Sequence, residues 1–167
     1  DWFGTERVAP RAWKAVKSLS ASYRIAREDQ DEVAISVWGF TGLMPAEQHL
    51  TGLQQGLVAG RWLGEGEEDV CLLPVGLAAA LDIDVEALST AEVRIFGEVF
   101  RVIGLLADDA LDRRDLSGEP LTPLDPEAQQ PVEAEVGGGR GQLMPFAHLP
   151  GSTIVVMPFA SLMRWEG

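Results

Sequence analysis

Residues 91–106, AEVRIFGEVFRVIGLL, decide the fold predicted for this chain. Two runs rich in β-branched and aromatic residues, 91–96 and 99–106, flank a turn at Phe96-Gly97-Glu98, which predicts a β-hairpin. The second arm is apolar on both faces: Phe100, Val102 and Leu106 share one face, and Val99, Ile103 and Leu105 share the other. Because a strand that is buried on both faces lies inside a sheet, we expect a central strand, in which Arg101 needs a partner or a sheet edge.

Outward from the hairpin, other stretches predict further strands and short helices. Residues 33–40, 69–73 and 153–158 are rich in β-branched or aromatic residues and predict strands. Pro74 stands in the first turn of a short Ala-rich helix that ends at Leu81, and residues 159–165 begin another helix. Residues 45–58 are expected to hold a short helix or an irregular segment, and residues 82–90 a turn. The pattern predicts an α+β fold, a mixed sheet with short flanking helices.

The chain divides, on this prediction, into two parts. Residues 1–31 form an N-terminal amphipathic helix and a polar linker, because apolar residues recur at helical spacing over residues 5–19 and polar residues follow. Residues 32–167 form a mixed α/β core. Within this core, residues 107–152 form a long acidic insert, rich in Pro and Gly, that we expect to be mostly loop.

Composition and charge narrow the possible functions. The 167 residues are 46% hydrophobic and 23% charged, an ordinary globular mix. The formal net charge of −13 lies wholly in residues 64–167, since basic and acidic residues balance in residues 1–63. An acidic surface repels phosphate backbones, so we expect no nucleic-acid partner. The longest mostly apolar stretch, residues 70–81, is too short to span a bilayer. The chain opens without Met and without a signal-peptide pattern, so we expect a piece of a longer protein.

No residue pattern assigns catalytic, cofactor or metal chemistry. The single cysteine, Cys71, falls in a predicted strand and is expected to be a small core residue. His49 and His148 are far apart in the sequence, carry no metal-binding or catalytic motif, and are expected on the surface or in loops. The glycine run at 137–141 lacks the lysine of a phosphate-binding loop. We therefore expect no enzymatic activity and assign no catalytic residue, cofactor or metal ligand.

An acidic segment follows the predicted hairpin and contains Asp108, Asp109, Asp112 and Asp115. Carboxylate oxygens are ligands that calcium prefers, but the spacing does not match a calcium-binding loop, and Arg113 and Arg114 interrupt it. A solvated turn is therefore favoured, and cation binding by the insert stays an open alternative. We interpret the four aspartates as a possible interaction loop.

Several short blocks occur in a recognisable order along the chain. They are the strand 35–39, the step Gly60-Arg61-Trp62-Leu63, the strand and helix at 69–81, the hairpin 93–106, and the strand that ends in Pro158. Together they resemble the MacB-like periplasmic core domain of ABC transporter permeases of the MacB/FtsX/Lol type. The chain departs from the family pattern at residues 88–92, where a Pro-x-Gly-Lys/Arg step is usual, and in the length of its insert.

The resemblance implies a MacB periplasmic core-like fold and a domain placed between two membrane helices of a permease, outside the cytoplasmic membrane. It implies a membrane-embedded, dimeric parent, with ATP hydrolysed by a separate cytoplasmic subunit or domain reached through the membrane helices. It also implies a protein partner in a transporter assembly. The domain would couple ATP-driven motion to that partner or to a substrate by rigid-body movement, with no catalytic residues.

Two other classes of function stay open on the sequence. A soluble enzyme would need a pocket in which polar residues of the insert converge with His49 or His148. A secreted structural or adhesion-like domain would need neither a pocket nor an ATPase.

Overall fold

The computed structural model describes residues 14–29, 34–114, 118, 120–126, 128 and 147–164. The strands are β1 (Lys14–Arg27), β2 (Ala34–Leu43), β3 (Leu57–Gly60), β4 (Val70–Pro74), β5 (Glu92–Ile95), β6 (Glu98–Leu106) and β7 (Ile154–Pro158). The α-helices are α1 (Glu47–Thr51), α2 (Val75–Ala80) and α3 (Phe159–Met163). Short 3₁₀ helices lie at η1 (Leu53–Gly56), η2 (Ala87–Ser89), η3 (Ala110–Asp112) and η4 (Gly151–Thr153).

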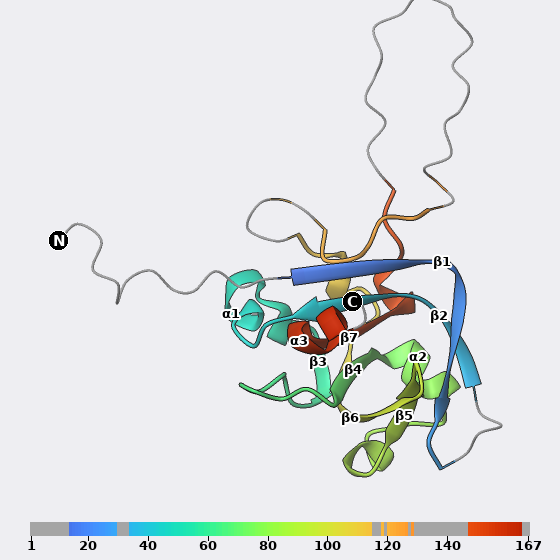
Figure 1. The fold of residues 1–167 in the computed structure, drawn as a ribbon. Coiled ribbons are helices and arrows are strands. Elements are labelled where there is room, and N and C mark those ends of the chain that lie inside the picture. The colour runs from blue at the N-terminus through green and yellow to red at the C-terminus, as the bar shows by residue number, and fades with distance from the viewer. Residues whose placement is uncertain are drawn as a thin grey trace, which may run out of the picture.

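The described strands form one mixed sheet in the order β3-β6-β4-β7-β2-β1-β5. Strand β5 also pairs with β6, so β6, β4, β7, β2, β1 and β5 join into a ring, to which β3 adds at β6. The β2–β7 and β4–β6 pairs are parallel, whereas the β1–β2, β3–β6 and β5–β6 pairs are antiparallel. This confirms the α+β class with a mixed sheet and short helices. Figure 1 shows β1 running beside β2 and then bending toward β5.

The hairpin predicted around Phe96 is confirmed as β5 and β6. Its two turn residues, Phe96 and Gly97, have φ of 50° and 84°, which is the left-handed geometry that closes a two-residue hairpin. A phenylalanine is costly in that region. Its ring packs on the fully buried Phe40, with ring centroids 5.3 Å apart, and this contact offsets part of the cost.

The prediction that β6 is a central strand is confirmed, but its assignment of faces is wrong beyond Ile103. An irregularity in the β4–β6 pairing places Cys71 opposite Val102 and the next residue, Leu72, opposite Gly104. The extra residue in β6 reverses the alternation. Leu105 therefore joins Phe100 and Val102 in one core, and Leu106 joins Ile103 in the other.

Two cores lie on the two faces of the central strands, because every residue of β4 and β7 is buried. One core contains Cys71, Leu73, Val155 and Met157, and the other contains Val70, Leu72, Ile154 and Val156. The alternation within each strand is what directs its neighbouring residues to opposite cores. Cys71 is fully buried in its core, as the sequence predicted.

The helix predicted over residues 5–19 is wrong from Lys14 onward. Residues 14–27 form β1, which pairs with β2 along most of its length and with β5 at its end. These inter-strand hydrogen bonds override the local helical spacing. Residues 1–13 lie outside the described residues. The predicted division of the chain at residue 31 also falls outside them, between two strands that pair with each other.

The described parts of the insert pack on the sheet. Leu111 and Leu121 are 1% and 0% exposed, and the hydroxyl of Thr41 in β2 donates to the carbonyl of Leu121 at 2.8 Å. Residues Leu124 and His148 form an isolated bridge that draws together the two described ends of the insert. The beginning and the end of the insert therefore belong to the folded core.

Candidate functional site

The acidic interaction loop follows β6 directly, and its carboxylates contact backbone N–H groups. The Asp108 Oδ1 accepts from the Gly76 N–H at 2.9 Å, and the Asp112 Oδ1 accepts from the Gly151 N–H at 3.1 Å. Asp109 is exposed. Asp115 lies outside the described residues. Asp108 thus ties the loop to α2 and Asp112 ties it to η4.

This arrangement gives Asp108 and Asp112 a structural use, because each hydrogen bond satisfies a backbone donor of another segment. A Cβ at Gly76 would stand 3.1 Å from an Asp108 carboxylate oxygen, and one at Gly151 would stand 2.9 Å from the Leu111 Cβ. In the part of the chain that the structure describes, no three His, Cys, Asp or Glu side chains gather as a metal site. The interaction loop stays a prediction.

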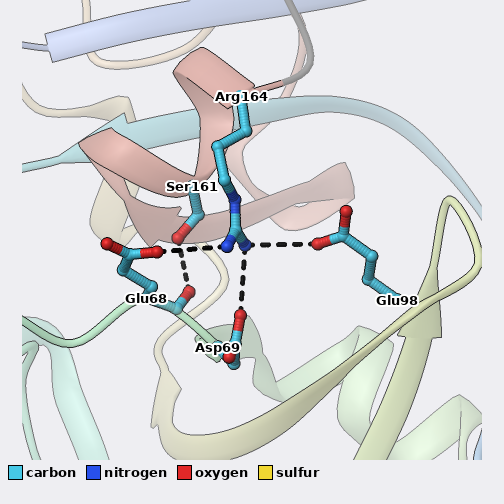
Figure 2. Close-up of polar contacts among 5 residues, drawn as sticks. All are labelled: Glu68, Asp69, Glu98, Ser161 and Arg164. Carbon is cyan, nitrogen blue, oxygen red and sulfur yellow. Dashed lines mark hydrogen bonds and ion pairs between the residues drawn. The ribbon is translucent and has the colours of Figure 1, made fainter.

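A second polar cluster centres on Arg164, which follows α3 (Figure 2). Its guanidinium contacts Glu68 at 3.1 Å, Asp69 at 3.1 Å and Glu98 at 3.2 Å. The Ser161 hydroxyl donates to the Glu68 carbonyl. Hydrogen bonding to Asp69, reinforced by the other two carboxylates, raises the pKa of Arg164. The cluster ties the C-terminal end of α3 to the β3–β4 loop and to the start of β6.

A groove runs beside β3 and consists of two pockets that share Val85. The arginine pocket has a volume of about 480 Å³, and its walls include Arg61, Leu88, Arg101 and Ile103. The valine pocket has a volume of about 450 Å³, and its walls include Val58, Val75, Ile83 and Leu105. We call the two pockets together the β3 groove. Each is within the size range of pockets that bind small molecules or side chains of a partner.

The basic and the acidic side chains of the β3 groove lie in different pockets. Arg61 and Arg101 line the arginine pocket, whereas Asp82 and Asp84 line the valine pocket. Arg61 forms a bidentate ion pair with Glu67, with N–O distances of 2.8 and 2.6 Å. That contact, opposed by desolvation and aided by the Gly64 N–H, lowers the pKa of Glu67 to about 2.

The Arg101 guanidinium is the second cation of the β3 groove, and its charge helps to lower the pKa of Glu67. It makes no hydrogen bond or close ion pair within the described residues, although Glu92 stands opposite it in the β5–β6 register. The sequence predicted that Arg101 needs a partner or an edge. It is exposed, and its charge faces solvent at the arginine pocket.

The two histidines lie apart from these pockets. His49 is exposed near the end of α1, and the His148 Nδ1 lies 2.8 Å from the Thr122 carbonyl oxygen. A third pocket, of about 200 Å³, lies beside Trp38, Asp125 and Leu149. Neither histidine lines any of the three pockets. The longest described α-helix, α2, has six residues, and no described helix has the length and apolar character of a membrane span.

Sequence reasoning missed both the Arg164 cluster and the β3 groove. Glu68, Asp69, Glu98 and Arg164 are separated by up to 96 positions and meet only through the fold. The sequence holds one local signal for the groove. Arg61 stands a few residues before the acidic turn at 64–69, and this spacing permits the Arg61–Glu67 pair.

Comparison with known proteins finds similarity among solved structures. No protein-family model matches the sequence, and no curated protein is similar to it. Among solved structures, the chain is similar to the periplasmic region of MacB from Actinobacillus actinomycetemcomitans, with 15% sequence identity and a TM-score of 0.49. The match covers 89% of this chain and 49% of that structure, so the chain spans about half the length of the periplasmic region that it matches.

Proposed function

We propose that this chain is an extracytoplasmic domain of an ABC transporter permease, held between two membrane helices and acting as a non-catalytic coupling module. Its partners would be an ATPase subunit or domain reached through the membrane helices, a second copy of the parent, and a protein of the transporter assembly. The sequence resemblance to the MacB/FtsX/Lol-type domain supports this proposal, since its blocks fall on β2, β3–β4, α2, β5–β6 and β7.

The observation that carries the proposal is a row of three residues across neighbouring strands. Lys14, at the start of β1, is paired with Leu43 of β2, and Leu43 is paired with Pro158 at the end of β7. Strands lie about 4.8 Å apart, so Lys14 and Pro158 are separated by about 10 Å. This is also the spacing of two packed helices, about 8–10 Å. The start of β1 and the start of α3, which follows Pro158, therefore lie at the same edge of the sheet, as a domain held between two membrane helices requires.

The attachment of α3 provides a route for coupling. Gly42 of β2 leaves room for α3, because a Cβ there would stand 3.0 Å from the Leu162 Cβ and 3.2 Å from the Phe159 Cα. The Arg164 cluster then ties the end of α3 to the β3–β4 loop and to β6. A movement applied to α3 would be passed to the sheet as a rigid body, since packed cores are not continuously deformable.

The test begins with the parent protein, in which we expect an apolar run of about 20 residues on each side of this domain. The parent carrying Glu65→Cys would then be exposed in intact cells to a thiol reagent that cannot cross membranes. Glu65 is an exposed loop residue, so labelling in intact cells is expected. The matched control is the unsubstituted parent, in which buried Cys71 stays unlabelled. A parent without flanking spans, or labelling of the variant only after lysis, would reject the proposal.

A further inference from the structure

The β3 groove exposes apolar side chains that a folded domain ordinarily covers. Val58, Val75 and Val85 are 58%, 37% and 61% exposed, and all three line the valine pocket. Single exposed valines need no explanation, but three around one concave pocket indicate a contact surface. Val58 and Val85 are the two most exposed of the large hydrophobic side chains that the structure describes.

The shape of the groove suits an extended chain. Val58 and Gly60 of β3 line it on one side, and Val102, Ile103 and Leu105 of β6 contribute to its floor. Four residues of a strand span about 13 Å, so a partner of several residues could lie along both pockets. Strand β3 also ends the sheet order, and its outer side has no strand partner within the described part of the chain. Such an edge offers backbone N–H and C=O groups to an added segment.

The charges of the groove favour a segment with an acidic side chain, and they favour placing that side chain at the arginine pocket. The Arg101 guanidinium is exposed and makes no hydrogen bond in the described part of the chain, so it can accept a carboxylate at the arginine pocket in addition to its charge interaction with Glu67. Asp82 and Asp84 at the valine pocket disfavour a carboxylate there. A net charge of −13 repels acidic proteins elsewhere, so Arg101 gives a local site for an acidic side chain on an otherwise unfavourable surface.

We propose that the β3 groove binds an extended segment of a protein partner, with an apolar side chain in the valine pocket and an acidic side chain at Arg101. This inference rests on the proposed function in one respect: it locates the binding site of the protein partner that the proposed function includes. It does not depend on the membrane helices.

The experiment presents the 167-residue chain to a display library of random heptapeptides. We expect enrichment of peptides that combine an apolar residue with Asp or Glu. The most enriched peptide is then synthesised with a fluorophore, and its Kd is measured by anisotropy. Arg101→Gln and Val85→Ser are each expected to weaken binding by about tenfold or more.

Two matched variants serve as controls. Arg114→Gln removes an exposed arginine whose side chain donates to the Gly118 carbonyl, away from the groove, and Val99→Ser removes a 39% exposed valine that does not line the groove. Both should leave the Kd within about twofold of the unsubstituted chain. Thermal melting of each variant by circular dichroism shows that the fold is retained.

Three results of the peptide-binding assay would overturn the inference. They are no enrichment, enriched peptides that lack an acidic residue, and binding that is insensitive to both groove substitutions. Self-association in sedimentation that Val85→Ser abolishes would instead assign the groove to a second copy of this chain, and would also reject a partner segment. Because the assay uses no membrane, its failure leaves the test of flanking spans unaffected.

Discussion

A bidentate ion pair joins Arg61 and Glu67 at the rim of the β3 groove. Both carboxylate oxygens of Glu67 accept from the guanidinium, and the Gly64 N–H adds a third hydrogen bond at 2.7 Å. These contacts favour the ionised carboxylate and hold its pKa at about 2, against an ordinary value of 4.5. The pair closes the acidic turn between β3 and β4 and positions Arg61 beside the arginine pocket.

We predict that removing the charge of Glu67 lowers the stability of the fold by an amount that depends on pH. Because the pKa of Glu67 is lower in the folded chain than in the unfolded one, the stabilisation is complete above pH 4.5 and is lost as the pH falls through about 2. We expect Glu67→Gln to lower the free energy of unfolding by about 1 kcal/mol at pH 7, since the pair is partly exposed. The difference between variant and unsubstituted chain should shrink as the pH falls below 4.5.

Urea unfolding at a series of pH values measures this difference. Glu65→Gln is the control, because Glu65 is in the same turn and makes no ion pair with the described residues. An equal loss in both variants, or a loss that does not depend on pH, would show that the Arg61 contact is not its cause.

Also at the residue scale, the sequence singled out the aspartates after β6 but did not show which groups they bind. Asp108 and Asp112 bond to the N–H groups of Gly76 and Gly151, which are 32 and 39 positions away. No local pattern shows that these donors need an acceptor. The prediction for Cys71, by contrast, needed only an apolar strand around it, and the structure confirms its burial.

At the element scale, α3 has only five residues and relies on contacts beyond its own hydrogen bonds. A helix this short is not stable by itself in water. Leu162 is fully buried against the sheet, and Arg164 reaches three carboxylates on two other segments. These ion pairs are exposed, so their effect is on the local opening of α3 more than on global stability.

Arg164→Gln should therefore loosen α3 without unfolding the chain. We expect the amide hydrogens of Leu162 and Met163 to exchange about two- to fivefold faster in the variant. High salt, which screens exposed pairs, should reduce the difference. Hydrogen exchange followed by NMR or mass spectrometry gives the rates. Arg114→Gln serves as the matched control, and unchanged exchange in α3 of the Arg164 variant would contradict this account of the cluster.

Strand β1 shows why element type can be misjudged from a single sequence. Val8, Ala12, Val16 and Leu19 recur at helical spacing, but Leu19, Ala21, Tyr23 and Ile25 also alternate as in a strand. Both periods are present in one stretch, and local preference does not decide between them. The pairing of residues 14–27 with β2 and β5 decides in favour of a strand. Without it, the edge of β2 would be unpaired and the ring of strands would be open.

At the scale of the whole molecule, ring closure joins the two cores. Strand β5 links β1 to β6, and the central strands β4 and β7 contribute side chains to both cores. Neither core can open without exposing the other side of the same strands. The described part of the chain should therefore unfold as one cooperative unit.

Two probes test this cooperativity. Far-ultraviolet circular dichroism follows the sheet, and labelling of Cys71 follows one core, because burial raises the pKa of its thiol and excludes reagent from the folded state. The midpoints in guanidinium chloride should coincide. Glu65→Cys, exposed in the β3–β4 turn, should label in the folded state and so shows that the reagent is active. Two separate midpoints would instead indicate parts of the described chain that unfold independently.

The sequence by itself determined the class of the fold and most of its central elements. Residues 69–73 and 153–158 are rich in apolar and β-branched residues and predicted strands, and the turn at Phe96-Gly97-Glu98 between two such arms predicted a hairpin; the structure confirms all of them. Only the tertiary structure decided the strand nature of residues 14–19, the reversal of faces within β6, the Arg164 cluster and the β3 groove. Each of these depends on hydrogen bonds or contacts between segments far apart in the chain, and the local pattern of residues does not decide them.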